Sequence, residues 1–196
     1  MQDAAADQIT KSMHTAMAPV GVLKGHDELH QAAGDLDIAT YAGHLLHGEV
    51  LPSFSEYDES DESQDALIEK ADQVTAGFGA EGQKLKGSLL GPDPIADWKT
   101  HNLPLVRAAW ARGDEAPANV FALAAIAAAR GGLPANASEE QLTEWFSNLI
   151  KESGFFAQDD GAEAQKFCDK LAAEAAGYAY TIQDEGVKTA LKANFQ

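Results

Sequence analysis

The sequence predicts an all-α protein, an irregular multi-helix bundle of about six to eight short helices with a long acidic loop and a Gly-rich connector. Apolar residues recur once per helical turn in several separate stretches, and no stretch of useful length alternates as a half-buried strand would. The apolar residues are mostly Ala, and only 8% of the chain is aromatic, which favours closely packed helices. With 196 residues, the chain is long enough to bury a sizeable core.

The clearest predicted helix begins at Ser138, which can form a capping box with Gln141. Apolar residues follow at the spacing of one helical face, namely Leu142, Trp145, Phe146, Leu149 and Ile150. Gly154 is placed to end this helix. The same pattern predicts a second helix after Asp159 and Asp160 and a last short helix over 187–195, so the C-terminal half is expected to be helical.

The middle of the chain predicts three further helical segments. Asp93 and Pro94 form a cap followed by a first-turn proline, and Pro104 restarts the chain before a segment that Gly113 closes. The stretch 119–130 is rich in Ala and apolar on nearly all sides. We therefore expect this stretch to be the central core helix or a partner surface.

The first half predicts two amphipathic helices, one ending at Gly48 and one after Ser63. Between them, residues 49–62 contain Pro52 and a dense acidic tract and predict an extended loop. The first 18 residues can form an arm that Pro19 and Gly21 stop. The predicted organisation is thus an acidic N-terminal helical part over 1–76 with an arm at 1–18, a Gly-rich connector over 77–91 and a C-terminal bundle over 92–196; packing as a single domain stays open.

The net charge of −17 disfavours direct binding to nucleic acid or to anionic membranes, because it repels phosphate where attraction is needed. A protein partner with a basic surface, or self-assembly, fits this charge better. The candidate partner-binding residues form an acidic tract, Glu56, Asp58, Glu59, Asp61 and Glu62. The tract lacks the glycine that a calcium loop needs at its sharp turn, and a solvated loop explains it equally simply.

A single cysteine, Cys168, excludes an intrachain disulfide framework and a thiolate cage for zinc. It lies on an apolar stripe, where a buried inert thiol is expected. The N-terminus has acids where a signal peptide needs bases, and the longest apolar stretch, 120–129, is too short to span a bilayer. We therefore expect a protein of the cytoplasm, or of a particle assembled there, with no membrane span.

Four of the six histidines, His26, His30, His44 and His47, form two pairs whose spacing suits metal ligands on one helical face. Glu28 and Glu49 would be the oxygen ligands of such a site. The zinc-peptidase motif is not matched in either direction. In the helix that carries His44 and His47, the apolar stripe points away from His47 and leaves His44 on a flank. The competing interpretation is therefore that these two histidines are solvated.

The glycines Gly77, Gly79 and Gly82 have the spacing of a dinucleotide-binding turn. That turn needs a strand before it and a helix after it, whereas a helical pattern precedes these glycines and Gly87 interrupts the segment after them. A flexible connector is therefore the preferred interpretation. No catalytic or cofactor-binding residue is predicted, and no cofactor is expected apart from a divalent metal at the histidines.

The leading functional hypothesis is a non-enzymatic helical interaction or structural protein, such as an adaptor or a component of a virus particle. Two alternatives remain: a metal-binding helical protein that uses the four histidines and carboxylates, and an acidic inhibitor that mimics nucleic acid on a basic partner. Whether the protein is an enzyme stays open, with the weak catalytic motifs speaking against it. Substrate, partner and oligomeric state are not determined by these patterns.

Overall fold

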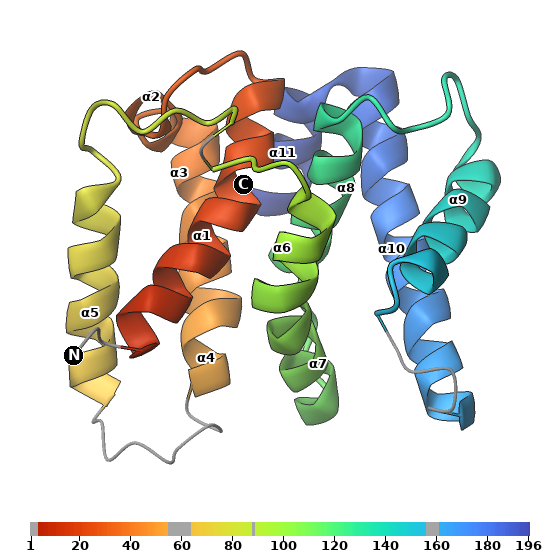
Figure 1. Ribbon diagram of the computed structural model, residues 1–196, viewed down its shortest axis with the longest axis horizontal. Helices are drawn as coiled ribbons and strands as arrows, with labels where there is room; N and C mark the ends of the chain where they lie inside the picture. Colours follow the sequence, from red (N-terminus) through yellow and green to blue (C-terminus); the bar gives the residue numbers. More distant parts are fainter. Residues whose placement is uncertain (1–3, 55–63, 88, 156–160) are drawn as a thin grey trace.

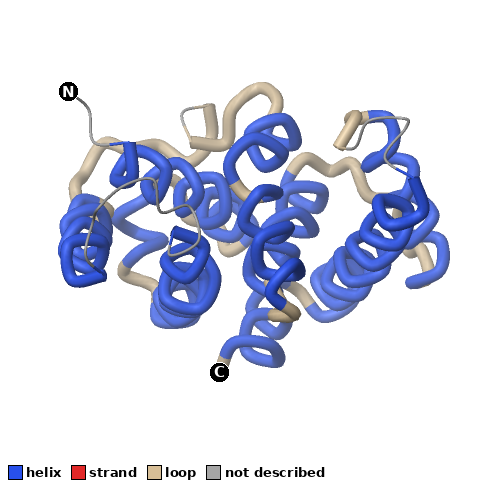
Figure 2. The backbone as a smooth tube through the Cα atoms, turned by 90° about the horizontal axis from the view of Figure 1, so that it is seen from below, coloured by secondary structure: helices blue, strands red, loops and turns tan. Residues whose placement is uncertain are grey.

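The all-α prediction is confirmed by the computed structural model, which describes residues 4–54, 64–87, 89–155 and 161–196. Figure 2 shows helices joined by loops and no strand in the described part of the chain. The only strand-like pairing among those residues is two isolated bridges, Glu28 with Lys84 and Lys86 with Leu90. No helix in these ranges is both long and apolar enough to cross a membrane.

The helices follow one another along the chain as shown in Figure 1. Their bounds are α1 Ala4–Leu23, α2 Leu29–Ala33, α3 Leu36–Gly43, the π-helical segment η1 His44–Val50, α4 Leu51–Phe54, α5 Gln64–Gly77, α6 Pro94–His101, α7 Leu103–Arg112, α8 Pro117–Ala129, α9 Glu139–Glu152, α10 Gly161–Glu185 and α11 Val187–Phe195.

Helix α8 forms the centre of the molecule, as its apolar composition predicts. Phe121, Leu123 and Ile126 are fully buried, and so are the alanines between them. Helices α1, α6, α7 and α10 and the segment η1 all pack against α8. Burying each large apolar side chain there stabilises the fold by about 2 kcal/mol, and the small alanines let the neighbouring helices approach closely.

Residues 4–23 form helix α1 of the core rather than the predicted N-terminal arm. Its apolar residues Ile9, Met13 and Met17 are buried against the core, and the helix runs through Pro19 and Gly21 to Leu23. The free energy gained by burying one whole face of α1 outweighs the cost of the backbone hydrogen bond that is lost because Pro19 has no N–H to donate. The prediction that these two residues stop the helix is therefore wrong.

The helix that was predicted to end at Gly48 continues to Phe54. After α3 the backbone widens into the π-helical segment η1, where the N–H of Leu51 donates to the carbonyl oxygen of Leu46, five residues earlier. Pro52 has no N–H to donate, and the wider turn carries the helix past it into α4. Residues 49–54 are therefore helical rather than the start of an extended loop.

The C-terminal half contains the predicted helices. Ser138 caps α9 through the expected capping box, with the Gln141 N–H donating to the Ser138 Oγ over 3.3 Å. Helix α9 packs along α10, and α11 returns towards the first half, where the Phe195 ring lies 5.1 Å from Tyr41 and 5.3 Å from Phe121. One hydrophobic cluster thus crosses the boundary drawn between 1–76 and 92–196, and the division into two parts stays a prediction.

Candidate functional site on helix α1

Helix α1 lies between α5 and α6 (Figure 1). Its sequence places a row of polar residues on one face. Asp7, Lys11 and His14 are spaced by four and three residues, which places them on the same side of the helix. Lys11 Nζ lies 2.7 Å from the Asp7 carboxylate, and the Lys11 side chain is about half exposed. The N-terminal half of this face is therefore open to solvent and offers both charges to a ligand.

His14 is the chemically distinctive residue of this row. Its Nε2 atom is buried and receives no hydrogen bond from any described residue, while its ring lies 5.1 Å from the ring of Phe78. Burial lowers the pKa of His14 below 6.5, because the charged form loses its hydration. The imidazole is therefore neutral at physiological pH, and its buried Nε2 is a polar atom without a partner among the described residues.

A second histidine, His101, lies at the C-terminal end of α6, next to the same part of α1. Its Nδ1 is also buried without a hydrogen-bond partner among the described residues. Burial lowers the pKa of His101, and the positive charge of Lys11 adds to the effect. The carbonyl oxygen of His101 accepts hydrogen bonds of 3.1 Å from Gln8 Nε2 and from Ser12 Oγ, which fix α6 against α1.

Behind this seam, a chain of buried amides connects α1 to α8. Asn102 Nδ2 donates to the carbonyl oxygen of Ser12 over 3.1 Å and to Asn119 Oδ1 over 2.7 Å. Asn119 Nδ2 donates in turn to Glu49 over 2.7 Å. Since Ser12, Asn102 and Asn119 are fully buried and Glu49 is nearly so, these bonds hold four segments in one arrangement.

Glu49 anchors the far end of this chain from the π-helical segment η1. Its carboxylate accepts the backbone N–H groups of Ala118 and Asn119 at 2.6 and 2.9 Å, so it caps the N-terminus of α8 from a position 69 residues earlier in the chain. Burial raises the pKa of Glu49 from 4.5 to about 7, although these donors favour the ionised form. A buried acid with such a pKa in a π-helical turn is a feature often found near functional sites.

Two aromatic side chains hold the first turn of α8 in place beside Glu49. The Tyr41 hydroxyl donates to the carbonyl oxygen of Ala118, and Trp98 Nε1 donates to that of Asn119, both over 2.9 Å. Both aromatic rings are fully buried. The segment α3–η1 and helix α6 therefore clamp α8 from two sides.

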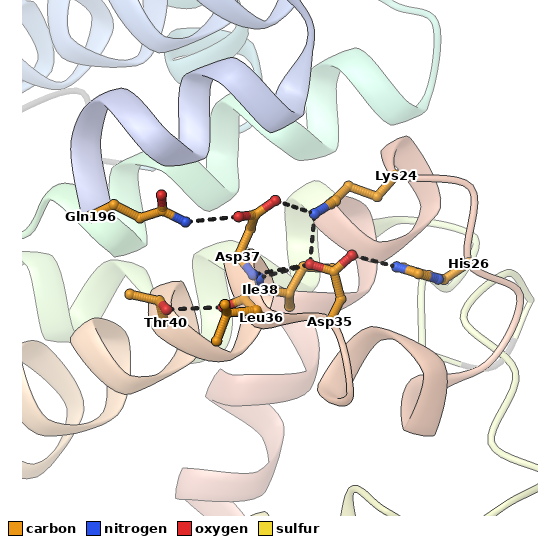
Figure 3. A network of polar contacts seen from close by, with 8 residues as sticks. All are labelled: Lys24, His26, Asp35, Leu36, Asp37, Ile38, Thr40 and Gln196. Atoms are coloured by element: carbon orange, nitrogen blue, oxygen red, sulfur yellow. Dashed lines mark hydrogen bonds and ion pairs between the residues drawn. The ribbon is translucent and has the colours of Figure 1, made fainter.

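A separate charged cluster joins the end of α1, the start of α3 and the C-terminus (Figure 3). Lys24 Nζ lies 2.6 Å from the carboxylates of both Asp35 and Asp37, and the Gln196 side chain donates to Asp37 over 2.7 Å. Burial acts against the charge of Asp35, but hydrogen bonds from Lys24 and His26 lower its pKa to about 2. The Lys24 ammonium is thus held charged between two carboxylates, and the cluster fixes the end of α1, the start of α3 and the C-terminus to one another.

The four histidines predicted as metal ligands are separately engaged. His26 pairs with Asp35 and His30 with Glu28, each at 3.1 Å, while the His44 ring lies 5.9 Å from that of Phe195. His44 and His47 are exposed, as the competing interpretation predicts. Among the described residues, no three His, Cys, Asp or Glu side chains are placed to hold a metal ion, and Glu49 binds α8 instead. The metal site stays a prediction without support from these contacts.

The predicted partner-binding tract lies outside the described residues. Glu56, Asp58, Glu59, Asp61 and Glu62 all fall within 55–63. Cys168, expected to be buried, is half-buried on α10.

The glycine-spaced segment does not form a dinucleotide-binding turn. Gly77 is the last residue of helix α5, and no strand precedes it within the described ranges. The segment instead runs back along α2, where Leu29 N–H donates to the Gln83 carbonyl oxygen over 2.8 Å. The arrangement that receives a pyrophosphate, a strand, a glycine turn and a helix N-terminus, is thus missing from these residues.

Comparison with solved structures identifies the fold. Over 98% of its length the chain is similar to part of Pseudomonas fluorescens mannitol 2-dehydrogenase, in a ternary complex with NAD and D-mannitol, with a TM-score of 0.68 and 17% sequence identity. It is also similar over 95% of its length to a D-sorbitol dehydrogenase in substrate-free form, with a TM-score of 0.66 and 17% identity. The chain spans 41% and 40% of those two chains. No family model and no curated protein sequence matches it.

These similarities contradict part of what the sequence predicted. The hypothesis of a non-enzymatic adaptor, structural protein or virus-particle component is wrong, because the fold is that of a part of two dehydrogenases. The expectation of no cofactor other than a metal is contradicted as well, because the first neighbour is a complex with NAD. No short motif in the sequence marks this fold, and residues 1–18 were interpreted as an arm rather than as part of the core.

Proposed function

We propose that this chain is the helical, polyol-binding part of a dehydrogenase of the mannitol and sorbitol type, with His14 facing the bound polyol. The observation that carries the proposal is the match of nearly the whole chain to part of an enzyme seen with D-mannitol. The chemistry of α1 supports it, because this helix carries an imidazole whose buried Nε2 has no partner among the described residues, one turn beyond the partly exposed Asp7–Lys11 pair.

A polyol suits this site for two physical reasons. It is uncharged, so the net charge of −17 does not repel it. Its hydroxyl groups both donate and accept hydrogen bonds, and the row on α1 offers partners for both: the carboxylate of Asp7, the ammonium of Lys11 and the imidazole of His14. In this proposal His14 Nε2 accepts the hydrogen of one bound hydroxyl and can hold its proton.

The described residues lack the usual site for the pyrophosphate of a dinucleotide such as NAD. They contain no strand that leads into a glycine turn and a helix N-terminus, so the strand–turn–helix cradle of a pyrophosphate does not form among them. We propose that a separate nucleotide-binding part, on the same polypeptide or on a protein partner, supplies that function, in keeping with the 41% of the neighbour's length that this chain spans. We place the protein in the cytoplasm, because its single cysteine gives no use for an oxidising compartment.

The experiment is a calorimetric titration of D-mannitol and D-sorbitol into the purified protein and two variants. His14→Ala removes the vacant imidazole nitrogen, whereas His44→Ala removes an exposed histidine of η1 as a matched control. We expect saturable binding to the protein and to His44→Ala, and a loss of about tenfold or more in affinity for His14→Ala. No saturable binding of either polyol, or equal affinities for the two variants, would overturn the proposal.

A further inference from the structure

A second candidate site lies away from α1, between α7 and α10. Two adjoining hollows of about 490 and 620 Å³ share Arg107 and Ala111 in their walls. We call them together the α7–α10 groove. Its lining includes four basic side chains and two neighbouring aromatic ones: Lys99, Arg107, Lys166, Lys170, Trp110 and Phe167. Each hollow has the size of a pocket for a small organic molecule.

The charge of the groove is opposite to that of the protein. Four of the 14 basic residues line it, Lys99, Arg107, Lys166 and Lys170, and Glu163 is the one acid among its described lining residues. Lys166 pairs with Glu163 at 3.1 Å and Lys170 with Glu174, outside the lining, at 3.6 Å, so within the described part of the chain the four cations outnumber the carboxylates paired with them by two. In a chain with a net charge of −17, such a cluster forms a local positive field. The groove is therefore a place where this protein can attract an anion.

The cations are positioned around two aromatic rings. The rings of Trp110 and Phe167 lie 4.3 Å apart, with Lys170 Nζ 4.2 Å from the Trp110 ring and the Arg107 guanidinium 5.9 Å from the Phe167 ring. Arg107 Nη2 also donates to the Phe155 carbonyl oxygen over 2.8 Å. These contacts fix the positions of the positive groups before a ligand arrives, which lowers the entropy cost of binding.

The second hollow continues this arrangement toward α6. Lys99 Nζ donates to the carbonyl oxygen of Ser153 over 3.1 Å, which holds its ammonium at the edge of the hollow that it shares with Arg107. A guanidinium carries five N–H groups in a planar fork that matches phosphate oxygens, and an ammonium adds a compact charge. The aromatic rings and the paired cations thus occupy successive parts of one groove.

We propose that the α7–α10 groove binds a small aromatic phosphate of the nucleoside monophosphate kind. The base packs against the exposed parts of the half-buried Trp110 and Phe167 side chains, beside the Lys170 ammonium, and the phosphate lies at Arg107 and Lys99. The aromatic rings favour this ligand over a purely acidic peptide, which has no group to stack. This site is distinct from the α1 site, and the inference does not rest on polyol binding.

Calorimetric titration with adenosine monophosphate tests the inference, with adenosine and inorganic phosphate as the partial ligands. We expect adenosine monophosphate to bind about tenfold or more tightly than either one, and added salt to weaken it. Equal binding of adenosine, or displacement of the nucleotide by a polyglutamate peptide at equal concentration, would overturn the proposal. The first outcome would remove the phosphate from the site, and the second would make the groove a peptide site.

Two lysine variants locate the binding. Lys166→Met changes an exposed residue whose ion pair is with Glu163, so the fold is expected to survive. Lys188→Met, on the exposed side of α11, is the matched control. Lys166 lines the hollow that holds the base, and its loss lowers the positive charge around the ligand, so we expect Lys166→Met to weaken adenosine monophosphate binding about threefold and Lys188→Met to leave it unchanged. Equal effects of the two changes would mean that only the overall charge matters and would refute the site.

Discussion

The carboxylate of Glu49 and the residue Asn119 meet twice: Glu49 Oε2 accepts the Asn119 backbone N–H at 2.9 Å and its side-chain amide at 2.7 Å. This pair joins the π-helical segment η1 to the first turn of α8, the helix against which α1, α6, α7 and α10 pack. It is also the end of the amide chain that reaches α1 through Asn102. The stability of the core is therefore coupled to the protonation of one buried acid.

Glu49→Gln is expected to remove a pH-dependent part of the stability. The pKa of Glu49 is about 7 in the folded protein and 4.5 without burial. The protonated acid therefore contributes to the free energy of unfolding in full below pH 4.5, and this contribution is lost as the pH rises to about 7. The loss is about 3 kcal/mol. Urea unfolding at pH 4.5 and pH 8 measures this loss. Between pH 4.5 and pH 8 the free energy of unfolding of Glu49→Gln should rise relative to that of the unchanged protein. Glu152→Gln, at an exposed position, should show the same pH dependence as the unchanged protein. A pH-independent difference would contradict the raised pKa.

Tyr41→Phe is expected to lower the free energy of unfolding by about 1 kcal/mol. The change deletes the buried hydrogen bond to the Ala118 carbonyl oxygen and keeps the ring packing against Phe121. Tyr180→Phe is the control, because 41% of that side chain is exposed. Denaturant titrations compare the two, and a Tyr180→Phe effect as large as that of Tyr41→Phe would argue against the clamp on α8.

Two glycines in helices are expected to respond to alanine with opposite signs. A Cβ at Gly21 would lie 2.6 Å from Leu85 Cδ1 and 3.0 Å from Ala32 Cβ, so Gly21→Ala should destabilise the protein by about 1 to 3 kcal/mol. Gly43 has helical dihedral angles and no atom near its missing Cβ, so Gly43→Ala should stabilise it by about 0.5 to 1 kcal/mol. The melting temperatures of both variants, measured by thermal unfolding, test these two signs. A higher melting temperature for both would mean that α1 does not pack closely against Leu85.

Lys24→Met is expected to lower the melting temperature at pH 7 by roughly 5 °C, because it leaves Asp35 and Asp37 without their shared cation. The folded-state pKa of Asp35 is about 2, so its contribution is present above pH 3.8 and is lost as the pH falls toward 2. The difference from the unchanged protein should therefore shrink in acid. Melting curves at pH 7 and pH 2.5 test this, with Lys188→Met as the neutral control; an equal difference at both pH values would refute the charge-based explanation.

Helices with local signals could be predicted from the sequence. Ser138 and Gln141 are three residues apart, and a capping box needs no other part of the chain to form. The Ala-rich stretch 119–130 indicated a core helix because it has no polar face, and α8 is that helix. These signals act within one or two turns, so a linear pattern contains them.

The site could not be predicted, because its contacts join distant residues. Glu49 and Asn119 are 70 positions apart, and Glu49 was expected in a loop or as a metal ligand. One signal was present: Asn119 is a polar residue at the start of an otherwise apolar helix, and a buried amide there needs a partner. His14 was missed because Pro19 and Gly21 suggested an arm, whereas tertiary burial of α1 overrides both.

The measurement that tests the proposed function most directly is an NMR titration of the imidazole signals of all six histidines with D-mannitol. We expect a saturable shift at His14, a smaller one at His101, and none at the exposed His44 and His47. Signals of His14 that stay unchanged at saturating mannitol, or shifts that are uniform over all the histidines, would contradict the proposed function.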